Sequence, residues 1–395
     1  MDWEKMTEQE LKKLLGEIKP LDQVAMAEAE RRQLLLAKPP GSLGRLEDIS
    51  IQIAGITGRV INDMDKTCIA IMSADNGVVS EGISSAPQGV TLAQTINFTR
   101  RITGVGSLAK HFGIDLLVVD MGINGEVPPA LLTKEMKGVD AGDGAGLRFV
   151  NQVVDRKLGP GTKNLSKEPA MSPRQVLQGI ATGIEAASQI SAMGYHAFGV
   201  GEMGIGNTTT SAAVLSALTG LPGKSTVGKG GGITQEAFLK KIAMVDQAIL
   251  RNGLGSDGCG KVDVLEVLGK VGGFDIVAMV GAFIGAAIYR IPVVIDGYIS
   301  VVAALAAVRL APEAGAFMVA SHASWEQGYR IAIHELGMEP LFSLGMRLGE
   351  GSGCPFAFHV MEGACAAMSG MALFSEAEID DAYLAEIRAD SKNCF

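Results

Sequence analysis

The stretch "CIAIMSADNG", residues 68–77, is a short apolar run that ends in an aspartate, an asparagine and a glycine. A continuous apolar run of this length is typical of a strand buried on both faces. Four more such runs occur: "IDLLVVD" at 114–120, "AFGVG" at 197–201, "PVVID" at 292–296 and "AFMVAS" at 316–321. Helix-length patterns lie between them, for example residues 172–193 and 209–218. This alternation predicts an α/β fold, with a mainly parallel, Rossmann-like sheet flanked by helices.

Polar and small residues follow each predicted strand. The continuations are "ADNG" at 74–77, "DMG" at 120–122, "GEMGIGN" at 201–207, "DGY" at 296–298 and "SHAS" at 321–324. In open parallel sheets, ligands bind beyond the carboxyl ends of the strands. Five polar strand ends therefore predict one ligand site along a single edge of the sheet.

The two ends of the chain differ from its middle. Residues 3–36 have helical patterns and little strand character, the turn "KPPG" at 38–41 follows, and helical patterns return after about residue 345. We predict a large α/β domain over 61–335. Residues 1–60 and 336–395 would together form a smaller helical domain, and the C-terminal part would also carry a glycine loop.

Composition excludes several classes of partner. Hydrophobic residues make up 47% of the chain and charged residues 19%, and the net charge is −9 without any block of lysine or arginine. This argues against nucleic acid or an anionic membrane as the main partner. The five cysteines form no CxxC pattern, which indicates a reducing compartment. The longest apolar run, residues 276–289, is too short for a membrane span, so we expect a cytoplasmic protein.

Two glutamates stand in glycine loops. Glu202 lies in "GVGEMGIGN", and Glu350 lies between Gly349 and Gly351 in "MRLGEGSG" before an apolar segment. A carboxylate held close to a ligand by backbone turns, with little water, is suited to acid–base chemistry. These two glutamates are therefore the best catalytic candidates on chemistry alone.

Other motifs give weaker signals. Residues 199–204 match G-x-G-x-x-G, but no strand and acid follow about twenty residues later, as a dinucleotide site requires. The same loop opens a helix at Asn207, whose N–H groups would suit a phosphate. A second glycine loop, "VGKGGGIT" at 227–234, could bind phosphate or be a simple turn. The sequence contains neither an HExxH motif nor a His/Cys cluster, so it predicts no metal site. Ser321 and His322 are adjacent, but the GxSxG motif of a nucleophile elbow is missing.

Taken together, the loops resemble those of the nicotinate-nucleotide:dimethylbenzimidazole phosphoribosyltransferase family. The similar segments are "KPPGSLGRLE" at 38–47, "ADNGVVSEG" at 74–82, "GVGEMGIGNTT" at 199–209, "KVGGFDIVAMVGAFIGAA" at 270–287, "DGYISVVAAL" at 296–305, "SHASWEQG" at 321–328 and "MEPLFSLGMRLGEGSG" at 338–353. They occur in collinear order over about residues 38–370, which makes them more specific than any single glycine motif.

The resemblance implies a pentosyltransferase of cobalamin biosynthesis. It would move phosphoribosyl from nicotinate mononucleotide to a benzimidazole-type base with inversion, giving α-ribazole 5′-phosphate and nicotinate, without a cofactor or a metal. It also implies a homodimer. The physiological base stays open between dimethylbenzimidazole, other benzimidazoles, adenine and phenols, and Ala86 stands where family members carry serine.

The resemblance also implies roles for single residues. Glu350 matches the catalytic base, with Glu202 and Lys241 as further catalytic residues; Lys240 is the alternative to Lys241. We expect Glu202 and Lys241 to form a charge pair. The substrate-binding candidates are Ser85, Gln94, Met203, Gly204, Ile205, Asn207, Thr208, Gly228, Gly230, Asp296, Ser321 and Leu348.

Two other classes remain open on the residues alone. One is a Rossmann-type nicotinamide-dependent oxidoreductase that uses the G-x-G-x-x-G loop. The other is a non-catalytic nucleotide-binding protein. Quenching of NADH fluorescence would identify the first, and release of nicotinate in the presence of a benzimidazole would exclude both.

Overall fold

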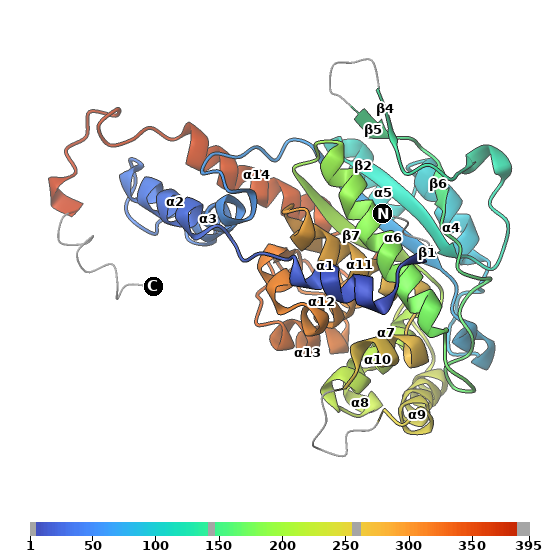
Figure 1. Ribbon diagram of the computed structural model, residues 1–395. Coiled ribbons are helices and arrows are strands. Elements are labelled where there is room, and N and C mark those ends of the chain that lie inside the picture. Colours follow the sequence, from blue (N-terminus) through green and yellow to red (C-terminus); the bar gives the residue numbers. More distant parts are fainter. Residues whose placement is uncertain (1–4, 141–146, 255–261, 385–395) are drawn as a thin grey trace.

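The computed structural model describes residues 5–140, 147–254 and 262–384 (Figure 1). Within them, a seven-stranded sheet has the order β3-β6-β2-β1-β7-β8-β9, and every neighbouring pair is parallel. Its strands are β1 (Thr67–Ala74), β2 (Asp115–Gly122), β3 (Leu132–Thr133), β6 (Val153–Asp155), β7 (Ala197–Met203), β8 (Val293–Ile295) and β9 (Met318–Ala320). The predicted parallel α/β fold is confirmed.

Helices cover the sheet and extend beyond it. They are α1 (Glu8–Gly16), α2 (Gln23–Leu35), α3 (Arg45–Thr57), α4 (Val90–Thr99), α5 (Gly104–Phe112), α6 (Pro173–Ala192), α7 (Asn207–Thr219), α8 (Gly223–Thr226), α9 (Gln235–Arg251), α10 (Val264–Val271), α11 (Phe274–Ile288), α12 (Tyr298–Leu310), α13 (Gln327–Glu335) and α14 (Cys354–Gly370). All five predicted strands and both quoted helical stretches are found.

Several short strands were not predicted. β3 and β6 have two and three residues, and β4 (Gly138–Asp140) pairs with β5 (Leu147–Phe149) as a separate antiparallel ribbon. Segments this short carry too few residues for an alternating or continuous apolar pattern to be recognised. Of these, β3 and β6 extend the large sheet beyond β2, whereas β4 and β5 form a sheet of their own.

The strand order places a topological switch beside β1. The chain runs from β1 to β2 on one side, and later returns to β7 on the other side of β1. At such a point the loops leaving the two strands diverge to opposite faces and open a crevice at their carboxyl ends. The loop after β1 and the "GEMGIGN" loop after β7 therefore border the same crevice.

Helices α6 and α11 pack with their backbones in contact. α11 is buried from Phe274 to Ala287, which explains the long apolar run seen in the sequence. A Cβ atom at Gly183 of α6 would overlap the carbonyl oxygen of Ala278, and one at Gly281 of α11 would overlap that of Ile180. The glycines thus allow the backbones of α6 and α11 to approach more closely than they could with a side chain at either position.

Replacing Gly183 by alanine is expected to destabilise the protein by about 2–3 kcal/mol, because two tightly packed helices must move apart. Gly363 of α14 is the matched control, since a Cβ there meets nothing within 4 Å. Gly363→Ala should leave stability unchanged or raise it by up to about 1 kcal/mol through helix propensity. Denaturant unfolding of both variants measures the difference, and equal effects would contradict the close packing.

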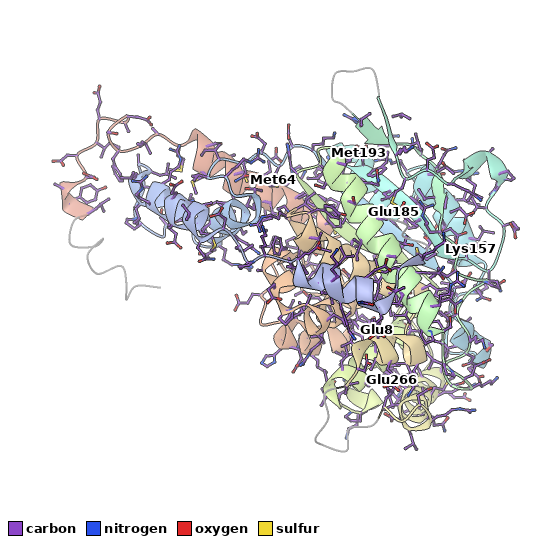
Figure 2. All side chains as sticks on the ribbon, viewed as in Figure 1. Glu8, Met64, Lys157, Glu185, Met193 and Glu266 are labelled. Carbon is purple, nitrogen blue, oxygen red and sulfur yellow. The ribbon has the colours of Figure 1, made fainter. Side chains whose placement is uncertain are left out.

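Helices from the two ends of the chain meet beside the sheet. α2, α3 and α14 lie side by side and project away from the strands (Figure 1). Met64 is buried with Ile49 and Ile53 of α3 and Met361 of α14, where this arm joins the sheet (Figure 2). α1, in contrast, packs against α11. The division into domains at residues 60 and 335 stays a prediction.

Across the described ranges, every helix is too short or too polar to serve as a membrane span.

Candidate active site

A cavity of about 310 Å³ lies at the switch point. It is lined from segments 83–94, 202–208, 229–241, 297–299, 324–326 and 347–350. Four of these segments leave the carboxyl ends of β1, β7, β8 and β9, and the last precedes α14. The predicted strand-end site is therefore a single pocket.

Glu350 has a backbone conformation that is rare for a residue with a side chain. Its φ is +64°, and the flanking Gly349 and Gly351 have φ of +82° and +87°. A Cβ at Gly349 would overlap Oε1 of Glu202, and the same Oε1 accepts a hydrogen bond from the Glu350 N–H at 3.2 Å. The left-handed turn thus brings the backbone of one candidate glutamate against the carboxylate of the other.

The Glu350 carboxylate is buried but hydrogen-bonded. Its Oε2 accepts from the Val105 N–H at 3.0 Å, at the amino end of α5, and its Oε1 accepts from Gln94 Nε2 at 3.4 Å. Burial raises the pKa of Glu350 above its ordinary value, and these bonds together with those from Gly104 and Thr103 counter the rise. A helix amino end favours the negative form of a carboxylate. The group is therefore a carboxylate whose basicity is increased by burial.

Glu202 belongs to a chain of buried polar groups. Asn207 donates from Nδ2 to Oε2 of Glu202 and, at 3.1 Å, to Oδ2 of Asp275. Burial, followed by the charge of Asp275, raises the pKa of Glu202 to about 8, and burial raises the pKa of Asp275 to about 7. One amide thus bridges two carboxyl groups that hold protons near neutral pH.

Lys241 lies on the buried face of α9. Its Nζ donates to Thr208 Oγ1 at 2.7 Å and to the carbonyl oxygen of Gly228 at 3.4 Å. Burial lowers the pKa of Lys241 to about 8, while the nearby Glu326 raises it. Lys240 is exposed and donates to the carbonyl oxygen of Glu81. Of the two lysines, only Lys241 contributes to the pocket.

The expected charge pair between Glu202 and Lys241 is wrong. Glu202 accepts from Asn207 and from the Glu350 backbone, and Lys241 donates to a hydroxyl and a carbonyl group. Within the described part of the chain, the carboxylate whose charge acts on Lys241 is that of Glu326. Two residues that line one cavity need not face each other across it.

The two glycine loops meet at the pocket. Gly204 to Gly206 lead into α7, where Gly206 has φ +93° as the residue before the first helical turn. A Cβ at Gly230 would lie 3.2 Å from Thr208 Oγ1, so the second loop packs directly on the start of this helix. The amino end of α7 offers backbone N–H groups and a favourable dipole to an anion.

The G-x-G-x-x-G match is not a dinucleotide loop. Gly199 and Gly201 lie inside β7 and contact the segment before and at the start of α14. A Cβ at Gly199 would lie 2.5 Å from Cys354 Sγ, and one at Gly201 would overlap the carbonyl oxygen of Glu350. The Rossmann interpretation needs its first two glycines in the phosphate turn, so these glycines serve packing instead.

Most of the predicted site residues line the pocket. They are Ser85, Gln94, Glu202, Met203, Gly204, Ile205, Asn207, Thr208, Gly230, Lys241, Leu348 and Glu350. Gly228 does not line it but accepts from Lys241. Asp296 and Ser321 were also expected to bind substrate, and they lie beneath the pocket, fully buried. A strand end predicts where a side chain emerges, not whether another loop covers it.

The pocket residues that were not predicted include four with polar or charged side chains: Tyr298, Ser324, Glu326 and Arg347. All four lie within segments that the family resemblance quotes, so the segments were found but not the residues. Burial raises the pKa of Glu326, and the charges of Lys241 and Arg347 counter part of this rise. The signal for Glu326 and Arg347 is that an acidic and a basic side chain interact at the pocket wall. This interaction is visible only in the structure, because the two residues are far from obvious partners in the sequence.

Raising the pH from 6.5 to 8 is expected to lower stability. The pKa values of Glu202, Asp275 and Asp296 are about 8, 7 and 7 in the folded protein, and near 4 when unfolded. The folded state therefore binds more protons in this window and loses stability as the pH rises, on the order of 3 kcal/mol in total. Lys241, whose pKa burial lowers to about 8, shifts stability in the opposite direction by less than about 1 kcal/mol in this window, and His322, whose pKa burial lowers to about 4, does not titrate there.

Thermal unfolding of the ligand-free protein at pH 6.5, 7.25 and 8 measures this slope. Glu202→Gln removes one of the titrating groups and should flatten it. A midpoint that rises with pH would contradict the protonation of the buried acids.

No group of three or more His, Cys, Asp or Glu side chains within the described ranges could hold a metal ion.

Comparisons with known proteins agree on one family. A family model described as Phosphoribosyltransferase matches residues 18–379. The nicotinate-nucleotide–dimethylbenzimidazole phosphoribosyltransferase of Clostridium perfringens strain ATCC 13124 is 49% identical over 385 residues, spanning 98% of this chain and 99% of that protein. The enzyme of the same name from Clostridium tetani is 42% identical, spanning 96% and 98%.

A solved structure has the same architecture. The crystal structure of CobT from Thermus thermophilus superposes with a TM-score of 0.80 at 34% identity, covering 90% of this chain and 99% of that one. With a family model over most of its length and relatives similar from end to end, the chain belongs to this phosphoribosyltransferase family.

Proposed function

We propose that this chain transfers the phosphoribosyl group of nicotinate mononucleotide to a 5,6-dimethylbenzimidazole-type base. The products are α-ribazole 5′-phosphate and nicotinate, and the reaction belongs to assembly of the lower ligand of cobalamin. The names of the similar enzymes support this. The observation that carries it is one cavity with a buried glutamate, Glu350, and the open amino end of α7 in its wall.

The reaction needs a base but no acid. The bond between C1′ and the pyridinium nitrogen breaks, and its electron pair returns to that nitrogen, so nicotinate leaves without a proton. One benzimidazole nitrogen attacks C1′ from the opposite face, and the other gives up its proton. Attack opposite the leaving group turns a β-linkage into an α-linkage. A single carboxylate suffices, unlike the acid and base pair of most glycosidases.

Glu350 is the base in this proposal. Its carboxylate accepts from the amino end of α5 and from Gln94, which favours the ionised form that a base requires. Burial raises its pKa, which increases its affinity for the proton of the incoming ring. After transfer the proton resides on a carboxyl group that its surroundings already tolerate in neutral form.

The other two catalytic candidates, Glu202 and Lys241, contact different parts of the pocket. Glu202 accepts the Glu350 N–H and lines the cavity, so it supports the loop that carries the base at the wall of the pocket. Lys241 donates to Thr208 at the start of α7. It therefore adds positive charge near the backbone N–H groups of Gly206 and Thr208, which would bind the 5′-phosphate. The N–H groups of Ile205 and Asn207 donate instead to Thr91 and Gly204.

Release of nicotinate from nicotinate mononucleotide tests the function. We expect release that depends on an added base and an α-linked product by NMR. The bases to compare are dimethylbenzimidazole, benzimidazole, adenine and phenol, because the pocket alone does not name the physiological one. Base-independent release, or none with any base, would contradict the transferase. NADH binding without nicotinate release would instead favour an oxidoreductase.

We also propose that the working unit is a homodimer. Large apolar side chains are exposed on α2, namely Val24, Leu34 and Leu35, on the arm that projects from the sheet (Figure 1). Val24 and Leu35 are eleven positions apart, close to three helical turns, so they lie on one face of α2. Exposed apolar residues along one face of a projecting helix are typical of an interaction surface. Sedimentation velocity should give twice the mass of one chain, and a monomer at micromolar concentration would contradict this.

A further inference from the structure

The loop that carries Glu350 needs support from outside itself. Gly349, Glu350 and Gly351 are three consecutive residues with φ between +64° and +87°. A non-glycine residue in this region costs free energy and persists only when its surroundings hold it. The position of the Glu350 carboxylate therefore depends on whatever anchors the backbone of this turn.

Asp296 is the anchor on the underside of the turn. It follows the last residue of β8, and its Oδ2 accepts from the Gly351 N–H at 3.0 Å while its Oδ1 accepts from the Gly353 N–H at 2.6 Å. The fit is tight, because a Cβ at Gly353 would lie 2.9 Å from Oδ1 of Asp296 and 2.6 Å from Oγ of Ser321. Ser321 in turn donates to the Asp296 carbonyl oxygen at 3.0 Å.

The loop provides the hydrogen-bond donors for this carboxylate. Within the described residues, the basic side chain that lies near Asp296 is His322, with its Nδ1 3.8 Å from Oδ1. Burial lowers the pKa of His322 to about 4, so it is neutral at pH 7. The other ionisable groups that interact electrostatically with Asp296 are Glu202, Glu350, Tyr329 and Cys354. Burial raises the pKa of Asp296 to about 7, and since none of these groups is a cation, the loop N–H groups are what favours its ionised form.

We infer that Asp296 is a positioning residue for the proposed base: by accepting two N–H groups of the Glu350 loop, it fixes where the Glu350 carboxylate lies. It does so from beneath the pocket, without touching the substrate. This inference rests on the proposed function, because it assigns a purpose to the turn only if Glu350 takes a proton there.

Asparagine at position 296 tests the inference. The Asp296→Asn amide keeps the shape but has one acceptor oxygen, so its NH₂ group would face one of the two loop N–H donors. A base misplaced by about 1 Å can lose about 10²-fold in rate. We expect kcat to fall about 10²-fold, while Kd for nicotinate mononucleotide changes less than about threefold because the phosphate contacts come from other loops.

A double-mutant cycle separates positioning from a general structural effect. If Asp296 acts through Glu350, then Asp296→Asn in the Glu350→Gln background should change kcat by less than about threefold, since the group it positions is already inactive. If the two losses multiply instead, Asp296 acts independently of the base and the inference is overturned.

Asp120→Asn is the control for a buried strand-end aspartate outside the pocket. Oδ1 of Asp120 accepts from the Gly122 N–H at 2.9 Å and the Ile123 N–H at 2.8 Å, and its Oδ2 lies 3.4 Å from Lys157 Nζ. The variant loses this ion pair and should lower the thermal midpoint, with kcat unchanged. A similar loss of kcat in Asp120→Asn and Asp296→Asn would show that any buried aspartate matters, and would overturn the inference.

The outcomes distinguish the inference from the function beneath it. If the wild-type chain releases no nicotinate, the proposed function fails and the inference with it. If it does, and Glu350→Gln abolishes release, the function stands and the cycle alone decides the role of Asp296. If Asp296→Asn does not fold, Ser321→Ala takes its place in the cycle. It should lower kcat at least threefold only when Glu350 is intact, and an unchanged kcat would overturn the inference.

Discussion

Replacing Glu350 by glutamine is expected to lower kcat by about 10²–10⁴-fold, the usual contribution of a general base. Glutamine keeps the shape and can still accept from the Val105 N–H, so the loop should stay folded. Affinity for nicotinate mononucleotide should be nearly unchanged, because the phosphate and ribose contacts come from other segments. Glu350→Asp, shorter by one CH₂, should recover only part of the rate, since proton transfer depends strongly on distance.

Two measurements on the same sample separate this role from a structural one. Titration gives Kd, and nicotinate release gives kcat; if the glutamate only held the turn, both would worsen together. Glu362→Gln is the control, because this carboxylate pairs with His359 on the exposed surface of α14. A Glu350→Gln variant with near wild-type kcat would exclude Glu350 as the base.

Removing the phosphate from the substrate is expected to have the second largest effect. Each charge-assisted hydrogen bond contributes about 1.5–3 kcal/mol. Losing two such bonds to the phosphate should make kcat/KM for nicotinate riboside about 10²–10⁴-fold lower than for nicotinate mononucleotide. The donors would be backbone N–H groups at the start of α7, near the second glycine loop. Competition between the two substrates measures the ratio directly.

Lys241 provides the control for this assignment. Lys241→Met removes the positive charge beside Thr208 and should slow the phosphorylated substrate more than the riboside, so that their ratio narrows. If the riboside reacts as well as the mononucleotide in the wild-type protein, neither glycine loop binds the phosphate.

The sequence predicts the sheet well because its main strands are continuous apolar runs. "CIAIMS" and "IDLLVVD" become the central strands β1 and β2, buried at every residue. β3 and β6 could not be predicted, since two or three residues carry no period. The pairing of β6 with β2 and of β3 with β6, rather than a local pattern, makes them strands.

The sequence predicted which segments form the site better than it predicted which side chains in them line the pocket. Lys240 and Lys241 are equivalent in the sequence, and only the buried face of α9, shared by Lys241 with Val245 and Ala248, separates them. Asp296 was predicted at the correct strand end, but its role changed because the Glu350 loop, 54 residues later in the chain, covers it. Local patterns predict which residues leave the strands, whereas loop order over the sheet decides which of them touch a ligand.

The switch point beside β1 has a consequence for how the protein folds. The walls of the pocket come from stretches as far apart as residues 83 and 350, so no early, local event on the folding pathway can build it. Closing loops of this length is slow, because the chain loses conformational entropy before the stabilising long-range contacts form. Recovery of activity during refolding should therefore lag behind recovery of helical circular dichroism. A fragment that stops before residue 349 would retain most of the sheet yet lack the group that takes the proton.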